Sequence, residues 1–284
     1  LVITYPLVGN YGVPQFTEEN GMLRFFESNR IHIRGLVISD YSFEYSHWNA
    51  VESLGKWLAD NDVPAVCGVD TRQITKIIRE RGVMLVEGTP EPEQFVDPNR
   101  ENLVAQVSTK QAQTYGNGRH RIVLVDCGCK YNIIRCLCDR DATVIRVPWD
   151  YDFTQLEYDG VMLSNGPGDP QQCGATVANI KKAIALGKPI FGICLGNQLL
   201  SIAAGATTFK LKYGHRSHNQ PALMVGTNRA VITSQNHGYA VDTATLDPEW
   251  EPYFVNLNDG TSEGIRHKSK PFFSVQFHPE ASGG

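Results

Sequence analysis

The sequence lacks the features that mark several large classes of protein. Its formal net charge is only −4 over 284 residues, with basic and acidic residues interspersed, so we expect no nucleic-acid partner. No apolar run approaches the roughly 18 residues that a membrane-spanning helix needs, so no membrane association is expected either. The opening residues Leu1–Thr4 include no initiator Met and no basic region, which argues against a signal peptide. A soluble, cytoplasmic globular protein is the expectation that remains.

Paired cysteine motifs are missing as well. The chain has seven cysteines, an odd number, and four of them have C-x-C spacing where zinc and redox sites have C-x-x-C spacing. We therefore expect most of them to be small buried side chains in a reducing compartment. Only Cys194 lies in a sequence context that indicates chemistry.

The sequence pattern predicts two domains. The polar, glycine-rich segment Gly116–Arg121 is followed by Ile122–Val125, an apolar run typical of a buried parallel strand. We place the boundary near residue 118, giving domains at 1–118 and 119–284. No internal repeat and no low-complexity tract is evident.

The first domain has a mixed α and β pattern. Leu36–Ile38 is expected to be a strand, and Ser46–Asp60 shows the apolar spacing of an amphipathic helix. A second helix is expected to start at Asp70 and to end at Gly82. These spacings indicate no chemistry by themselves.

The second domain alternates short apolar runs with helical patterns. Such alternation predicts an α/β fold with a doubly wound, mostly parallel sheet covered on both faces. Sheets of this kind bind ligands at the carboxyl ends of their strands. The expected strands are 122–125, 143–147, 160–163 and 189–193, and the expected helices include 133–137, 177–186 and 198–204.

Phe191–Gln198 is the first of three segments that indicate chemistry. An apolar strand runs into Gly-x-Cys-x-Gly and then into a helix, which is the cysteine form of a nucleophile elbow. Gly192 and Gly196 fit this turn because a Cβ at either position would crowd it. The helix N-terminus favours a thiolate at Cys194, and its backbone N–H groups can hold an oxyanion. The alternative is a buried structural cysteine beside two packing glycines.

The second segment, Phe273–Glu280, ends in a histidine and a glutamate two residues apart. In an extended chain, His278 and Glu280 would share one face with their Cα atoms about 7 Å apart. The carboxylate would then bind one ring nitrogen and leave the other for a substrate or thiol, while Pro279 restricts the backbone between them. The alternative is a surface turn.

The third segment, Leu163–Pro170, follows a predicted strand and contains two glycines that expose backbone N–H groups. Taken alone, it is equally typical of an ordinary Gly/Pro turn. All three segments, however, lie at the ends of predicted strands, so the fold would bring them to one edge. Their combination suits a Cys-His-Glu hydrolase that acts on an amide through a thioester.

These three segments resemble the class I glutamine amidotransferases, whose signature is an F-G-I-C-x-G-x-Q elbow and a terminal H-P-E. The chain is similar, more narrowly, to the glutaminase component of carbamoyl-phosphate synthetase, and the eukaryotic pyrimidine-pathway type is the most similar. The narrower resemblance rests on Thr4–Gly12, Gly68–Arg72, Leu163–Pro170 and Ser234–Tyr239, and the pathway type on 126–132, 135–138 and 147–150.

The resemblance implies a fold and a set of site residues. Residues 1–118 would be the small-subunit-type domain without its first segment, and 119–284 a flavodoxin-like amidotransferase domain without its last helical part. Cys194 would attack the side-chain amide of glutamine, and His278, oriented by Glu280, would transfer protons. Gly168 and Leu195 would supply oxyanion N–H groups. The residues implied to hold the amino-acid end of glutamine are Gly166, Gln198, Asn236, Gly238 and Tyr239.

The resemblance also implies partners. Ammonia would pass through an internal tunnel to a fused or separate synthetase, which uses ATP, Mg²⁺ and bicarbonate. This chain itself is expected to bind no cofactor and no metal. His215 and His218 lie in one polar loop, but no third metal ligand is evident near them. Lys130 is expected to be a solvated side chain, with a place near the interface or tunnel as the alternative.

Some positions depart from the family pattern, and four rival interpretations follow. Asn197 replaces a family histidine, Tyr239 replaces a phenylalanine, and a family serine that contacts glutamine is missing. The rivals are a regulatory or structural domain, an arginine-pathway enzyme, an anthranilate- or guanylate-type amidotransferase, and a cysteine peptidase or deglycase. The retained Cys194, His278 and Glu280 argue against the first, and the N-terminal segments against the third. The loop 166–168, with the residues implied at 236 and 238, argues against the fourth.

Overall fold

The computed structural model describes residues 1–82, 84 and 97–283. By its contacts the chain forms two compact units, Leu1–Met84 and Leu85–Gly284. Residues 97–118 thus belong to the second unit by contacts, and the predicted domain boundary near residue 118 stays a prediction. Within the described residues, none of the helices combines the length and the apolar character that crossing a bilayer requires.

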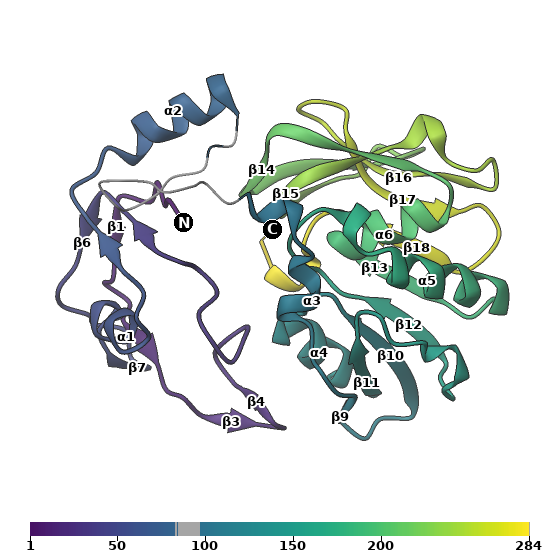
Figure 1. The fold of residues 1–284 in the computed structure, drawn as a ribbon, viewed down its shortest axis with the longest axis horizontal. Helices are drawn as coiled ribbons and strands as arrows, with labels where there is room; N and C mark the ends of the chain where they lie inside the picture. The colour runs from purple at the N-terminus through teal and green to yellow at the C-terminus, as the bar shows by residue number, and fades with distance from the viewer. Residues whose placement is uncertain (83, 85–96, 284) are drawn as a thin grey trace. The chain divides into compact units, whose positions relative to one another are not determined.

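The first unit is built from short strand pairs and the helices α1 (Leu54–Asp60) and α2 (Thr71–Arg81) (Figure 1). Its small core gathers Leu36, Ile38, Leu58 and Val63. The strand pairs are β1 (Leu7–Val8) with β6 (Asp40–Tyr41), β2 (Val13–Pro14) with β7 (Ala50–Glu52), β3 (Glu18–Glu19) with β4 (Met22–Leu23), and β5 (Leu36–Val37) with β8 (Ala65–Val66).

Helix α1 (Leu54–Asp60) is shorter than the sequence predicted. The expected helix from Ser46 is wrong in its first half, because Ala50–Glu52 forms strand β7 against β2. Helical spacing cannot reveal a pairing with a strand more than 30 residues away. The helix begins where the side chain of Ser53 accepts a hydrogen bond from the amide of Lys56 (3.2 Å).

Helix α2 (Thr71–Arg81) confirms the second helix prediction. The carboxylate of Asp70 accepts a hydrogen bond from the amide of Gln73 (2.9 Å) and so caps the first turn. Gly82 ends the helix with a φ of +87°, a conformation that glycine adopts without steric cost.

The second unit contains one ten-stranded sheet, and its parallel centre confirms the predicted α/β fold. The strand order is β15-β14-β16-β17-β18-β13-β12-β10-β11-β9. The parallel strands are β10 (His120–Asp126), β11 (Ala142–Pro148), β12 (Gly160–Leu163), β13 (Ile190–Ile193) and β18 (Phe272–Val275). The strands joined antiparallel are β9 (Gln113–Tyr115), β14 (Thr207–Met224), β15 (Ala230–Asp242), β16 (Trp250–Asn256) and β17 (Ser262–His267).

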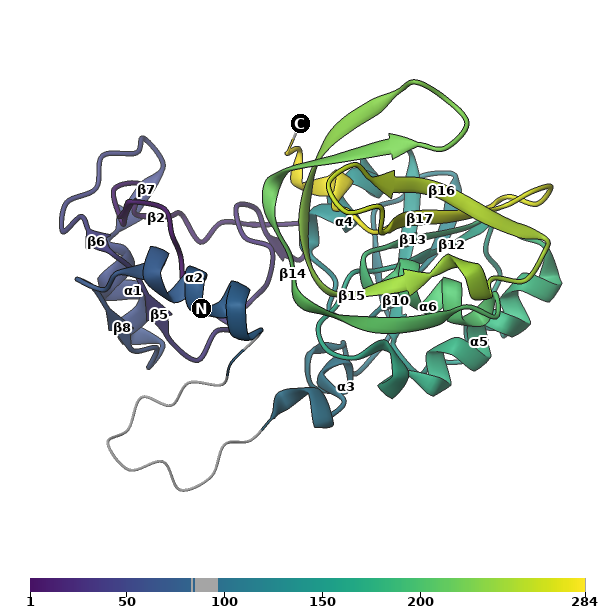
Figure 2. The same cartoon turned by 90° about the horizontal axis from the view of Figure 1, so that it is seen from above.

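Helices cover both faces of the parallel strands (Figure 2). Helix α4 (Tyr131–Cys138) connects β10 to β11, and α5 (Gly174–Leu186) connects β12 to β13. The two connections run in opposite directions along the sheet, so right-handed crossovers place these helices on opposite faces. Helix α6 (Leu195–Ala203) packs beside α5, α3 (Leu103–Val107) precedes β9, and short 3₁₀ turns lie at 98–100, 153–155, 170–172, 243–245 and 279–281.

The strand order reverses between β10 and β12, and this reversal locates the site. At such a point the connections leave toward opposite faces, so a crevice opens at the carboxyl ends of the strands. The segments that follow β10, β12 and β13 begin at Cys127, Ser164 and Cys194. The core beneath them is apolar and fully buried, as Val123, Leu163 and other strand residues show.

Candidate active site

Cys194 stands at the turn between β13 and α6. Its φ is +54° and its ψ is −104°, a combination that residues other than glycine rarely adopt. Its amide donates a hydrogen bond to the carbonyl of Val275 (2.9 Å), which ties the turn to the neighbouring strand β18. The side chain is buried at the start of the helix. The sharp strand-to-helix turn predicted from the motif is present.

The two glycines of the motif have no room for a side chain. A Cβ on Gly192 would lie 2.6 Å from the carbonyl oxygen of Gly196, and a Cβ on Gly196 would lie 2.3 Å from that of Leu163. Both contacts are with backbone atoms, which cannot rotate away. The helix α6 can therefore approach β12 and β13 this closely only with glycine at these positions.

His278 and Glu280 form a hydrogen-bonded pair in which Nδ1 and Oε1 lie 2.7 Å apart. The extended geometry expected from the sequence is wrong. Strand β18 ends at Val275, and the chain turns through the 3₁₀ segment Pro279–Ala281, with His278 at its start. This turn, not strand alternation, brings the carboxylate to the ring. The amide of His278 also donates to the carbonyl of Ser234 (2.9 Å), so strand β15 holds the segment in place.

The electrostatic surroundings favour the charged forms of this pair. Burial alone would lower the pKa of His278, but its hydrogen bond and charge interaction with Cys194, followed by those with Glu280, raise it to about 9. Burial would likewise raise the pKa of Glu280, yet its hydrogen bond and charge interaction with His278, helped by Lys130, hold it below the usual value. The neighbours of His278 therefore favour the protonated form of its ring.

Lys130 is a member of this group that the sequence did not assign. Its Nζ lies 3.3 Å from Oε1 of Glu280 and 3.3 Å from Nδ1 of His278. The expectation of a solvated side chain is wrong, because only 36% of it is exposed and it pairs with a buried carboxylate. The available signal was its position between the end of β10 and the start of α4, at the same edge of the sheet as the turn at Cys194.

The loop after β12 lies against this turn. A Cβ on Gly166 would lie 2.0 Å from the carbonyl oxygen of Cys127 and 2.8 Å from Cδ2 of Leu195, so only glycine fits. Gly168 has a φ of +89°, which also favours glycine. At Gly166 the loop therefore lies beside Leu195, the first residue of α6, and the role expected of its backbone N–H groups stays a prediction.

Strand β15 also borders the turn at Cys194. Burial first, and then the charge and hydrogen bond of Asp169, raise the pKa of Tyr239 to about 12, which places this tyrosine beside the loop after β12. Gln198 donates through Nε2 to the carbonyl of Tyr239 (3.1 Å) and to Oε1 of Gln276 (3.1 Å). The carbonyl of Asn236 lies 4.0 Å from Sγ of Cys194.

The remaining predicted residue, Gly238, follows Asn236 by two positions in β15, and a Cβ there would lie 3.6 Å from Nη2 of Arg216. The structure thus gathers the predicted residues on four neighbouring segments: the loop after β12, the start of α6, β15 and the segment after β18. Their roles toward a substrate stay predictions.

Asn197, which departs from the family pattern, is part of the scaffold. Its Nδ2 donates to Oε1 of Gln276 (3.0 Å), and its Oδ1 accepts from the hydroxyl of Ser274 (2.8 Å). The side chain is fully buried. An amide satisfies both neighbours at once, since it offers a donor and an acceptor.

The expectation that His215 and His218 lie in a polar loop is wrong, because both lie on strand β14, where their contacts differ. His218 bonds the hydroxyl of Ser234 (2.7 Å), whereas His215 lies with His237 and Glu263 in a buried group outside the cysteine site. The hydrogen bond that His215 donates to Glu263, and then the one to Asp259, raise the pKa of His215 to about 9 against the effect of burial. Burial lowers the pKa of His237 to about 4.

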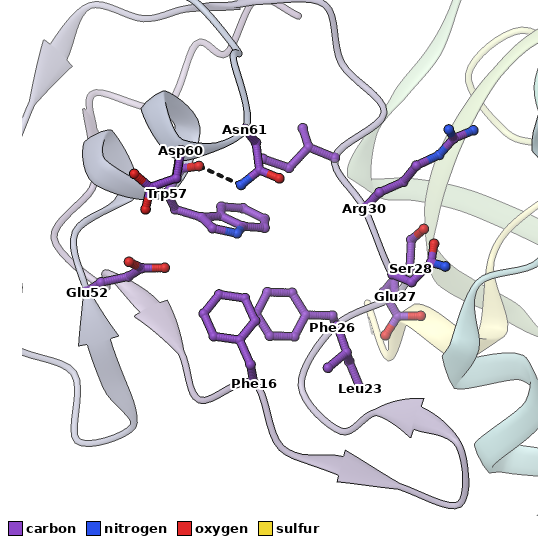
Figure 3. Close-up of a pocket in the computed structure, with 12 residues that line it drawn as sticks. Phe16, Leu23, Phe26, Glu27, Ser28, Arg30, Glu52, Trp57, Asp60 and Asn61 are labelled. Carbon is purple, nitrogen blue, oxygen red and sulfur yellow. Dashed lines mark hydrogen bonds between the residues drawn. The ribbon is translucent and has the colours of Figure 1, made fainter.

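A cavity of about 450 Å³ in the first unit has a different character (Figure 3). Its walls include Phe16 stacked on Phe26 and Trp57 tilted against Phe26, with ring centroids 5.1 Å and 5.7 Å apart. Lys56 forms ion pairs with the nearby Glu52 and Asp60. The residues that line it include no thiol and no imidazole, so the cysteine chemistry expected of the chain has no place there.

Both parts of the chain match known protein families. Residues 123–284 match the family "Glutamine amidotransferase class-I", and residues 1–87 match "Carbamoyl-phosphate synthase small chain, CPSase domain". Multifunctional protein CAD of Squalus acanthias is 52% identical over 293 residues, and the whole of this chain covers 13% of that protein. The arginine-specific small chain of carbamoyl phosphate synthase from Saccharomyces cerevisiae is 49% identical over 302 residues, and this chain covers 73% of it.

A third relative is the human protein named "Carbamoyl-phosphate synthase [ammonia], mitochondrial", 49% identical, of which the chain spans 19%. The chain thus spans only a part of these relatives. Among solved structures, a Thermoplasma acidophilum protein described as part of a GMP synthase shares the fold, with a TM-score of 0.51 and 24% identity over 58% of this chain and 86% of that one. On the full-length similarity and the two family matches, the chain belongs to the carbamoyl-phosphate synthase small-chain family and carries its class-I glutamine amidotransferase domain.

Proposed function

We propose that the chain hydrolyses L-glutamine to glutamate and ammonia through a thioester on Cys194. The observation that carries this proposal is the joint placement of a strained, helix-capping cysteine and a histidine that is hydrogen-bonded to a carboxylate at 2.7 Å. A cationic ring beside a sulfur is the arrangement that makes a cysteine nucleophilic near neutral pH.

The proposed reaction has two halves. The sulfur of Cys194 attacks the side-chain amide carbon, and the C–N bond breaks as His278 gives a proton to the departing ammonia. A water molecule then attacks the thioester while His278 takes one of its protons, which releases glutamate and restores the thiol. Glu280 keeps the ring oriented and stabilises its charged form in both halves.

The neighbouring residues would bind the substrate. The N–H groups of Gly168 and Leu195 would donate to the oxyanion, since the loop after β12 lies against the first residue of α6. Gly166, Gln198, Asn236, Gly238 and Tyr239 would hold the amino-acid end of glutamine. The hydrogen bond between Gln198 and the carbonyl of Tyr239 supports this assignment, because it fixes two of the walls together.

The ammonia would serve a carbamoyl-phosphate synthetase partner, fused or separate. The match of residues 1–87 to the CPSase domain of the small chain supports this pairing. That partner would use ATP, Mg²⁺ and bicarbonate, and the reaction would take place in the cytoplasm. We propose supply of pyrimidine synthesis, on the resemblance of residues 126–132. Arginine supply is the alternative, since relatives named arginine-specific are 49–50% identical.

Glutamate release tests the proposal in the wild-type protein and in Cys194→Ala, each with and without the synthetase partner. We expect slow turnover by the wild type alone, stimulation by the partner, and loss of turnover in the variant. Cys67→Ala, at an exposed cysteine of the first unit, is the matched control and should keep full activity. Equal activity in Cys194→Ala and the wild type would refute the thioester mechanism.

A second candidate is a regulatory or structural amidotransferase domain without useful turnover. The observation that favours it is the 49% identity to a relative whose name specifies ammonia. Absence of glutamate release from the wild type with a competent partner would support this candidate and exclude the first.

A further inference from the structure

Three buried side chains converge outside the cysteine site. They are His215 on β14, His237 on β15 and Glu263 on β17, and each offers a nitrogen or oxygen within 4.8 Å of the others. Glu263 is 0% exposed, and both histidines are buried as well. The proposed glutamine hydrolysis uses none of the three, so their convergence calls for a separate explanation.

The outward-facing nitrogen of each ring is already engaged. Nδ1 of His237 lies 2.8 Å from the carbonyl oxygen of Tyr239, which can only accept, so Nδ1 carries the proton. Nε2 of His215 lies 2.8 Å from a carboxylate oxygen of Asp259, and a proton there completes that bond. Each neutral ring then turns a lone pair inward. Metal-binding histidines are held in the same way, by a carbonyl or a carboxylate on the far nitrogen.

The space between the rings is surrounded mostly by acceptors. Oε1 of Gln235 lies 3.0 Å from Nδ1 of His215 and 3.1 Å from Nε2 of His237. Oε1 of Glu263 lies 3.5 Å from Nδ1 of His215 and accepts a hydrogen bond from Asn256 (2.8 Å). Among the described residues, Nδ2 of Asn256 is the one amide donor near Nδ1 of His215, also at 3.5 Å.

The second carboxylate oxygen of Glu263 completes the argument. Among the described residues, Oε2 of Glu263 has no hydrogen-bond partner, although it is buried. No Lys or Arg of the described residues forms an ion pair with this carboxylate, and its one contact of that kind is with Nδ1 of His215 at 3.5 Å. A buried, half-satisfied carboxylate among inward lone pairs is unfavourable unless a cation offsets its charge.

We propose that this group binds a divalent transition-metal ion of the zinc class. Nδ1 of His215, Nε2 of His237 and a carboxylate oxygen of Glu263 would be its ligands, with Gln235 or a water in the fourth position. Imidazole and carboxylate ligands suit Zn²⁺, which binds them at roughly 2.0–2.2 Å. Ligand atoms would then stand about 3.3 Å apart in a tetrahedron, so the group would close slightly around the ion.

The site would be structural. It would join β14, β15 and β17 at one point, and His237 lies between Asn236 and Gly238 on the strand that faces Cys194. The ion would therefore fix the strand that is proposed to hold glutamine without contacting the substrate. The rival is a proton in place of the ion: His215 as an imidazolium between Asp259 and Glu263.

Metal content of the full chain distinguishes the two. The protein is stripped with a chelator, titrated with Zn²⁺ alone, and assayed for bound metal after dialysis. We expect one Zn²⁺ per chain and a higher Tm with zinc, and binding weaker by roughly 100-fold or more in Glu263→Gln and His215→Gln. His218→Gln, which changes a histidine three residues away and outside the group, is the matched control and should bind zinc as the wild type does.

A measurement on the wild type alone covers the case in which a variant does not fold. Anomalous diffraction at the zinc edge from zinc-soaked crystals should place the ion between the two rings. Less than stoichiometric zinc, equal affinity in Glu263→Gln and the wild type, or an anomalous peak only elsewhere would overturn the proposal in favour of the proton. Because these readouts do not involve glutamine, failure here leaves the proposed hydrolysis untouched.

Discussion

Replacing Gly196 by Ala tests whether the close approach of α6 to β12 sets both the stability and the activity of the protein. A Cβ at this position would lie 2.3 Å from the carbonyl oxygen of Leu163 and 2.8 Å from its carbonyl carbon. Leu163 is a fully buried residue at the end of β12, near the middle of the sheet, so its backbone cannot yield alone. The φ of Gly196 is not in the left-handed region, so the substitution adds crowding without backbone strain.

The size of the effect follows from the shortfall in distance. An ordinary contact begins at 3.4 Å, so the helix start must move by 3.4 − 2.3 = 1.1 Å. Overpacking of this kind costs about 1–3 kcal/mol of the free energy of unfolding. Cys194 and Leu195 lie on the segment that moves, and a displacement of about 1 Å in a catalytic group lowers the rate roughly 100-fold.

Urea unfolding and glutamate release measure both effects in one preparation. Gly174→Ala is the matched control, since Gly174 begins the neighbouring helix α5 and a Cβ there meets nothing within 4 Å. That control should be as stable as the wild type, or more stable by up to about 1 kcal/mol, with unchanged turnover. If Gly196→Ala matches Gly174→Ala in both measurements, the steric account of the turn is wrong.

Two further predictions concern buried charges. In Glu280→Gln, the loss of the carboxylate should lower the pKa of His278 from about 9, so the high-pH limb of the kcat/KM profile should move to lower pH; an unmoved limb would contradict the pairing. Because folding raises the pKa of His278, this group stabilises the fold fully below its ordinary pKa of 6.5, and the contribution is lost as the pH rises toward about 9. Because folding lowers the pKa of Glu280, the contribution of this group is present above its ordinary pKa of 4.5 and is lost at lower pH. The variant should therefore be most destabilised between these ordinary values, at about pH 4.5–6.5, by urea unfolding. Asp126→Asn should lower the free energy of unfolding by about 3–5 kcal/mol in the same assay, because it breaks a buried ion pair with Arg146 at 2.7 Å. Asp139→Asn, at an exposed aspartate, is the control, and equal stability of the two variants would refute the estimate.

The parallel half of the second unit was predictable because its local signals agree with its tertiary structure. Strands buried on both faces are nearly continuous apolar runs, so Ile122–Val125 and Gly160–Leu163 identify themselves. The glycine spacing around Cys194 identifies the turn, because the space there admits no other residue at two of its positions. The edge of the sheet where the site lies then follows from the alternation of strands and helices.

The antiparallel part was not predictable in the same way. Strands β14 and β15 are half exposed along much of their length, so their burial patterns are irregular. Two register shifts between them further break the alternation that a sequence pattern would need. The pairing of Lys130 with Glu280 was not predicted for a related reason. It joins residues 150 positions apart, and their contact depends on the turn after β18.

The third member of the histidine group, Glu263, could not be predicted from the sequence. His215 and His237 are cross-strand partners in β14 and β15, so their proximity is a matter of register between two neighbours. Glu263 lies on β17, which is separated from β14 by β16 in the strand order. A flat sheet would keep it about two strand spacings, roughly 9–10 Å, from His215. Their side chains meet at 3.5 Å, and β15 contacts β17 directly although two strands separate them in the order, so the sheet curves there. Curvature of this kind arises from twist and bulges summed over many residues, and no spacing rule applied to one segment reveals it.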